Sequence, residues 1–159
     1  MNEINLNYYL QNNKFFKNIF KNIYNISLFI SNIFNWNYLL IILFNLYLLK
    51  ILTINEILQF FILTSLLIII KYFIKRKRPF NVNKNIKNLD NSKLDPYSFP
   101  SGHVFVASLL MMYLKDNLSG KYKTIIILLV GLSRIMLGVH YLSDVIASYL
   151  LAKSLFIIM

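Results

Sequence analysis

Two histidines occur in this chain of 159 residues, and each lies among polar side chains at the end of an apolar run. His140 is followed four residues later by Asp144, a spacing that places both side chains on one face of a helix. A carboxylate in that place fixes the imidazole tautomer and leaves the other ring nitrogen unprotonated, as a nucleophile or a general base requires. The other interpretation is a pair that only stabilises the helix, although a carboxylate is costly within an apolar run.

Groups suited to binding an anion accompany both histidines. Arg134 precedes His140 by six residues, and its planar guanidinium can bind two phosphate oxygens at once. Before His103, Ser101 is a preferred helix N-cap, and Gly102 lets an anion approach the free N–H groups of a helix start. His103 would then be placed to give a proton to a leaving oxygen. An ordinary capped helix with an incidental histidine is the alternative.

A cationic cluster precedes both histidine motifs. Lys71 and Arg78 are seven residues apart, so on a helix ended by Pro79 they share a face and lie about 10 Å apart along the axis. Lys75 falls on the same face. Taken alone, this cluster indicates either a phosphate site or a solvated anchor at a membrane surface.

These motifs lie in a chain whose composition is typical of a membrane protein. Hydrophobic residues make up 57%, whereas Asp and Glu together number 6. A soluble domain of this size needs a large polar exterior, so we expect the excess apolar surface to face lipid. The net charge of +11 does not indicate nucleic-acid binding, because the cations flank apolar runs as interface anchors do. The lack of cysteine excludes disulfides and thiolate metal sites.

The apolar segments predict an all-α fold. The chain has room for six membrane-spanning helices, the fourth of them short. We expect an integral membrane six-helix bundle, preceded by an amphipathic helix at Met1–Lys17 that lies on the membrane interface, and a single domain over residues 1–159. The expected spans are Asn18–Asn35, Asn37–Ile54, Glu56–Ile74, Ser101–Leu114, Lys123–Leu137 and Tyr141–Ile158.

In chain order the cationic cluster comes first, the cluster at residues 100–103 second and the cluster at residues 133–144 third. In this order the three clusters resemble the motifs of the type 2 phosphatidic acid phosphatase (PAP2) superfamily, also called the haloperoxidase-like lipid phosphatases. The chain looks like a small bacterial member, and the resemblance covers residues 71–144 with their flanking helices. Lys77 departs from the pattern, because a proline is common there in the family. The matching positions are Lys71, Arg78, Pro79, Pro100, Ser101, Gly102, His103, Ser133, Arg134, His140 and Asp144.

The resemblance implies a membrane phosphatase that works without a metal ion or another cofactor. His140 would attack phosphorus and become phosphorylated, oriented by Asp144. His103 would protonate the leaving oxygen and then activate water. The groups expected to hold the phosphate oxygens and to neutralise charge in the transition state are Lys71, Arg78, Ser101, Gly102 and Arg134.

The resemblance implies that the substrate is a lipid phosphate and that the protein is surrounded by membrane lipids. Undecaprenyl diphosphate is our first hypothesis, with phosphatidylglycerophosphate or phosphatidate as alternatives. A noncatalytic membrane protein that binds lipid phosphates is the alternative of another class. We expect no nucleic-acid partner and leave the oligomeric state open. Once Lys71, Arg78 and Arg134 are left out as site residues, more cations remain on the membrane face opposite the site than on the face of the site. Because cations are more frequent on the cytoplasmic face, we expect the site towards the outer face of a bacterial inner (plasma) membrane.

Overall fold

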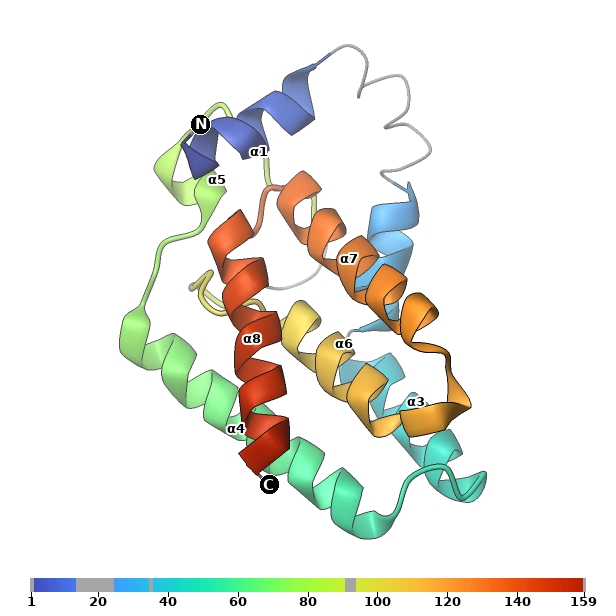
Figure 1. Ribbon diagram of the computed structural model, residues 1–159. Coiled ribbons are helices and arrows are strands. Elements are labelled where there is room, and N and C mark those ends of the chain that lie inside the picture. Colours follow the sequence, from blue (N-terminus) through green and yellow to red (C-terminus); the bar gives the residue numbers. More distant parts are fainter. Residues whose placement is uncertain (1, 14–24, 35, 91–93, 159) are drawn as a thin grey trace.

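The computed structural model describes residues 2–13, 25–34, 36–90 and 94–158, which form helices joined by loops (Figure 1). The all-α prediction is confirmed. In chain order the helices are α1 (Glu3–Asn12), a helix at Asn25–Ile33, α3 (Trp36–Leu48), α4 (Ile54–Ile74), α5 (Pro79–Val82), α6 (Gly102–Tyr113), the short 3-10 helix η1 (Lys115–Asn117), α7 (Gly120–Met136) and α8 (Leu142–Ile158).

Each of the six predicted spans overlaps one helix of the structure, although α3, α4 and α7 begin one to three residues before the predicted start. The six helices are Asn25–Ile33, α3, α4, α6, α7 and α8. Residues 14–24 and 35, which belong to the predicted N-terminal helix and first span, lie outside the described residues. In the described part of the chain, α4 alone is long and apolar enough to cross a bilayer by itself. The helix at Asn25–Ile33 reaches that length only together with Tyr38–Leu48, as one bent span. A bundle that crosses the membrane six times therefore stays a prediction.

Helix α6 occupies the centre of the bundle, where α4, α7 and α8 pack against it (Figure 1). Nine of its twelve residues are buried. Phe105 lies in the main core together with Leu63 of α4 and Ala152 of α8. Because this core surrounds α6, it fixes the first turn of the helix, which carries His103, relative to the neighbouring helices.

The end of α4 differs from the helix that the lysine and arginine spacing predicted. The helix ends at Ile74, because Lys75 adopts the left-handed conformation with a φ of 54°. Residues 76–78 follow as non-helical chain, and Pro79 starts α5. The expectation of one helix running up to the proline, with Lys75 on the face of Arg78, is therefore wrong. In an extended segment alternate side chains point to opposite sides. Arg78 is buried, whereas Lys75 is exposed.

The predicted site motifs gather at one end of the bundle. The C-terminal ends of α4 and α7 meet the N-terminal ends of α6 and α8 there, and α1 and α5 lie at the same end (Figure 1). Lys71 comes from the last turn of α4, Arg134 from the last turn of α7, and Asp144 from the first turn of α8. The fold thus brings together residues that are 73 positions apart in the sequence, from 71 to 144.

Helix α1 packs on α7, and Glu3, Asn7 and Gln11 bind neighbouring segments of the protein. An interfacial helix turns its polar side towards water. Here Asn7 has no exposed surface, whereas Tyr8 and Tyr9 are exposed. The prediction of a helix in this region is confirmed for Glu3–Asn12, whereas its place on the membrane interface stays a prediction. Its place gives α1 a role in the site, which is described below.

Apolar side chains cover the outer faces of four helices of the bundle. Phe73 of α4 is 88% exposed, and Ile158 of α8 is 79% exposed. Contiguous apolar surface on this scale is unusual on soluble proteins and fits contact with lipid. Other exposed apolar side chains are Leu40, Ile41, Phe44 and Leu48 on α3, Ile62 and Ile69 on α4, Leu128 and Leu132 on α7, and Ile146, Leu150 and Ile157 on α8.

Candidate active site

The predicted pair of His140 and Asp144 is buried at the junction of α7 and α8. His140 lies in the loop before α8 rather than on a helix, and its Nδ1 is 3.5 Å from Oδ2 of Asp144. Its other ring nitrogen, Nε2, lies 3.4 Å from Nη1 of Arg78. The carboxylate therefore faces one nitrogen, as the spacing predicted, and the second nitrogen is directed towards a predicted phosphate-binding cation.

The environment of His140 favours the neutral imidazole. Burial lowers the pKa of this side chain well below its usual value, and the positive charges of Arg78 and Arg134 lower it further. A neutral ring with a free lone pair on Nε2 is the form that a nucleophile needs. Burial and the two nearby cations thus all favour the neutral form of this imidazole.

Three buried cations surround this imidazole. Lys71, Arg78 and Arg134 are 5%, 1% and 0% exposed. Nη1 of Arg78 also donates a hydrogen bond of 3.0 Å to the carbonyl of Val139, the residue before His140. Buried cations require compensating negative charge. Their convergence at one end of the bundle is therefore the electrostatic setting for an anion.

Three buried polar atoms of the predicted site have no hydrogen-bond partner among the described residues. They are Oγ of Ser101, Nε of Arg134 and Nδ1 of His140. Most buried polar groups have a partner. Nδ1 of His140 faces Asp144, so the atoms available to a ligand are Oγ of Ser101 and Nε of Arg134. The hydroxyl of Ser101 and the Nε–H group of Arg134 are donors, which phosphate oxygens accept. Ser101 takes the N-cap position of α6, but its side chain does not cap the helix, contrary to the expectation from sequence.

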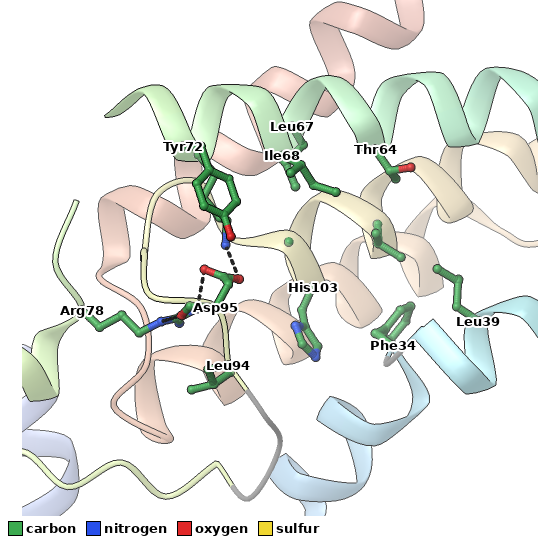
Figure 2. A pocket seen from close by; sticks show the side chains of 13 residues that line it. Phe34, Leu39, Thr64, Leu67, Ile68, Tyr72, Arg78, Leu94, Asp95 and His103 are labelled. Atoms are coloured by element: carbon green, nitrogen blue, oxygen red, sulfur yellow. Dashed lines mark hydrogen bonds and ion pairs between the residues drawn. The ribbon is translucent and has the colours of Figure 1, made fainter. Parts of the chain in front are cut away.

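Gly102 and His103 form the first turn of α6 and line a pocket. A methyl group on Gly102 would contact Leu67 at 3.9 Å and no other described side chain, so the protein leaves space above this turn. The Nε2 atom of His103 lies 3.1 Å from the carbonyl oxygen of Ser31, and its ring points into the pocket (Figure 2).

The pocket has a volume of about 390 Å³ and is lined by residues of α3, α4, α6 and the loop before α6. Its two ends differ in chemistry. Arg78 and Asp95 lie at one end, Phe34 and Leu39 at the other, and His103 between them (Figure 2). A ligand with an anionic group at one end and an apolar body at the other fits this arrangement.

The carboxylate of Asp95 lies between two of the predicted phosphate-binding cations. Its Oδ2 is 3.0 Å from Nζ of Lys71, and its Oδ1 is 3.2 Å from Nη2 of Arg78. Burial by itself raises the pKa of Asp95, but Lys71 and Arg78 outweigh it and hold this pKa below its usual value. Asp95 is therefore ionised at neutral pH and takes the place of an anionic ligand on these cations.

Replacing Asp95 with asparagine should strengthen the binding of phosphate-like anions. A neutral amide competes less well for Lys71 and Arg78, so we expect the inhibition constant of vanadate to fall about tenfold, which corresponds to about 1.4 kcal/mol. Inhibition of phosphate release over a range of vanadate concentrations measures this. Asp116→Asn, which changes an exposed carboxylate in η1, is the control. An inhibition constant that is unchanged or higher in Asp95→Asn would contradict the competition.

Carboxylates are the main functional group that the sequence patterns missed. Asp90 forms an ion pair with Arg134, and Arg76 forms ion pairs with both Asp144 and Glu3. A signal in the sequence is the small number of acidic residues, because in a chain with 6 acidic and 17 basic residues a carboxylate readily finds a cation as partner. The four carboxylates that bind cations at this end of the bundle are Glu3, Asp90, Asp95 and Asp144.

All eight predicted site residues lie at this end of the bundle, in two linked groups. One group lines the pocket, and the other is buried beside it. The groups are joined by the contact of Arg78 with His140, and by Ser31, which accepts a hydrogen bond of 2.6 Å from Arg134 and also contacts His103. The first group is Lys71, Arg78, Gly102 and His103, and the second is Ser101, Arg134, His140 and Asp144.

Comparison with known proteins agrees with this arrangement. Among solved structures, LpxE from Aquifex aeolicus shares the fold with a TM-score of 0.68 at 24% sequence identity, over 94% of this chain and 96% of that chain. A family model of the PAP2 superfamily matches residues 34–159, a range that contains every predicted site residue. Because this match covers well over half of the sequence, the chain belongs to the PAP2 superfamily.

Proposed function

We propose that this protein is an integral membrane phosphatase that hydrolyses a phosphomonoester or a diphosphate of a lipid through a phosphohistidine. Membership in the PAP2 superfamily supports a lipid phosphatase. The observation that carries the proposal is the pocket. Arg78 and Asp95, with Lys71 bound to Asp95, form its polar end, His103 lies in between, and Phe34 and Leu39 form its apolar end. These two ends match the phosphate and the hydrocarbon of a lipid phosphate.

In the first step, Nε2 of His140 attacks phosphorus. A nitrogen–phosphorus bond forms while the bond from phosphorus to the lipid oxygen breaks. The imidazolium form of His103 gives a proton to that oxygen and becomes neutral. Nδ1 of His140 keeps its proton, which the carboxylate of Asp144 at 3.5 Å stabilises. The nonbridging oxygens bind Lys71, Arg78, Arg134, the hydroxyl of Ser101 and the amide of Gly102, which together spread the charge of the transition state.

In the second step, water releases the phosphate. His103, which gave up its proton in the first step, accepts a proton from water as the water oxygen bonds to phosphorus. The nitrogen–phosphorus bond breaks, inorganic phosphate leaves, and His140 returns to its neutral form. The proton taken from water restores His103 for the next cycle. The two histidines thus need different contacts. His140 lies beside Arg78 and Asp144, and His103 faces the pocket.

The charge needed for this reaction is supplied by side chains. Lys71, Arg78 and Arg134 converge where many phosphoryl-transfer enzymes place metal ions. In the part of the chain that the structure describes, no group of three or more His, Asp or Glu side chains has the arrangement of a metal site. We therefore propose that the protein acts without a metal ion or another cofactor.

The membrane is the proposed location of this reaction. The length and apolar character of α4, and the exposed apolar faces of α3, α7 and α8, support an integral membrane protein. We propose that the site faces the outer side of a bacterial plasma membrane. A cysteine introduced at Lys77, an exposed position in a chain with no cysteine of its own, tests this orientation. In intact cells a membrane-impermeant maleimide should label it, and protection until the cells are broken would contradict the orientation.

Purified protein in detergent should release phosphate from lipid phosphates, and excess EDTA should leave the rate unchanged. Vanadate should inhibit, because a five-coordinate adduct with His140 mimics the transition state. The substrate panel is undecaprenyl diphosphate, phosphatidylglycerophosphate and phosphatidate, with the highest kcat/KM expected for the first. Loss of activity in EDTA that Mg²⁺ restores would contradict a metal-free mechanism. Binding of these lipids without phosphate release would support the noncatalytic alternative.

A further inference from the structure

Three polar residues of α1 bind the loop that carries His140. Glu3, Asn7 and Gln11 are spaced four residues apart, so they lie on one face of the helix. Asn7, which has no exposed surface, donates a hydrogen bond of 3.0 Å to the carbonyl of His140. Gln11 donates to the carbonyl of Met136 at 3.2 Å. Helix α1 therefore holds the main chain on both sides of the turn between α7 and α8.

This turn is shaped to fit α1. Gly138 has a φ of +75°, and a Cβ atom there would lie 2.6 Å from Nε2 of Gln11 and 2.6 Å from the carbonyl of Lys87. The glycine is therefore required both for its backbone conformation and for the close approach of α1. Because α1 and this turn are closely packed, α1 helps to fix the position of the turn that precedes His140.

Glu3 reaches beyond the turn to α8 and to Arg76. One carboxylate oxygen accepts a hydrogen bond of 2.8 Å from the N–H group of Ser143, which is a free donor in the first turn of α8. The other oxygen accepts a bond of 2.9 Å from Nη2 of Arg76. Glu3 thus caps α8 from another helix and holds the guanidinium at the same time.

Arg76, which binds Glu3, also binds the carboxylate beside His140, that of Asp144. Its Nη1 lies 2.6 Å from Oδ1 of Asp144, and its guanidinium stacks over the ring of Tyr141 at 4.0 Å. The other oxygen of Asp144, Oδ2, accepts a hydrogen bond of 2.9 Å from the N–H group of Tyr141 and faces Nδ1 of His140 at 3.5 Å. With both of its oxygens held, the carboxylate has one orientation towards the imidazole.

We propose that Arg76, held in place by Glu3, is a positioning residue that orients Asp144 against His140. The inference rests on the proposed phosphatase function. It adds to the family match, which begins at residue 34 and so does not include Glu3. Arg76 is not among the residues that line the pocket, so it acts on the reacting groups through Asp144 and not on the substrate.

The first test is Arg76→Ala. Misplacement of the carboxylate should lower kcat about 10- to 100-fold, while KM stays within about twofold because the pocket is unchanged. The guanidinium is 32% exposed, so guanidinium ion added at millimolar concentration should enter the vacated place and restore part of kcat. A purely structural role for Arg76 predicts no such rescue. Lys77→Ala, which removes an exposed neighbouring cation, should keep wild-type kinetics.

The second test is a double-mutant cycle of Glu3→Gln and Arg76→Ala. Glu3→Gln keeps the shape of a partly exposed side chain and therefore the fold. If Glu3 acts through Arg76, Glu3→Gln should lower kcat about fivefold alone and cause no further loss in Arg76→Ala. Independent losses that multiply in the double variant, or a wild-type kcat in Arg76→Ala, would overturn the positioning role while the enzyme stays active. A wild-type protein that releases no phosphate from any lipid would instead overturn the proposed function, and this role with it.

Discussion

Replacing His140 with alanine should abolish turnover of every substrate, with kcat lowered about 10⁴-fold or more. Nε2 of this residue is the nitrogen directed towards Arg78, and no second side chain of the site is placed to form the same covalent bond. The loss should be equal for lipid phosphates and for activated aryl phosphates, because the nucleophile is needed whatever the leaving group. Phosphate release by wild-type and variant protein, purified side by side, measures it.

Two controls accompany this substitution. Lys77→Gln changes an exposed cation of the same segment and should leave kcat at the wild-type value. Thermal unfolding in detergent verifies that His140→Ala is folded, since the variant leaves a small cavity beside α8. Turnover of His140→Ala within tenfold of the wild type would show that another residue is the nucleophile.

Replacing His103 with alanine should have an effect that depends on the leaving group. A lipid alkoxide needs a proton as it leaves, so cleavage of a lipid phosphate should slow by about 10² to 10⁴. An aryl phosphate such as p-nitrophenyl phosphate releases an oxygen that needs little protonation. Its first cleavage, seen as a burst of p-nitrophenol, should therefore stay within about tenfold of the wild-type rate in His103→Ala, and the burst should be absent in His140→Ala.

The same variant should accumulate phosphorylated protein. Without His103 to activate water, the second step is slow while the first proceeds with the aryl substrate. Rapid quenching followed by detection of acid-labile phosphate on the protein should find phosphohistidine in His103→Ala and none in His140→Ala. Phosphate on the His140→Ala protein, or equal rescue of both variants by the aryl phosphate, would show that the two roles are assigned wrongly.

The helices, and the places of the motif residues along them, follow from the sequence for physical reasons. Apolar runs indicate helices whatever they pack against, so each predicted span overlaps a helix of the structure. Motif residues lie at the ends of those runs, and helix ends are where a bundle brings separate segments together. The positions of Lys71 and Arg134 in the last turns of α4 and α7 follow from this rule.

The contacts that the sequence did not predict depend on conformation and on distant pairing. The end of α4 was misplaced because Lys75 turns the chain with a positive φ, which is uncommon for a lysine and has no signal in the sequence. Nothing in the sequence separates Arg76 from the other cations of residues 71–78. Its pairing with Glu3, across 73 positions, is set by how α1 packs on the bundle. Spacing rules describe neighbours on one helix and do not reach such pairs.

The apolar end of the pocket also determines how a substrate would arrive. Leu39 of α3 lines that end, Leu67 and Ile68 of α4 line the middle of the pocket, and the outer faces of these two helices are apolar. A lipid would therefore approach by lateral diffusion within its own leaflet and enter sideways, and its hydrocarbon would never cross water. The rate would then follow the mole fraction of substrate in the surface rather than its molarity. Adding neutral detergent at a fixed total amount of substrate should slow the enzyme by surface dilution alone.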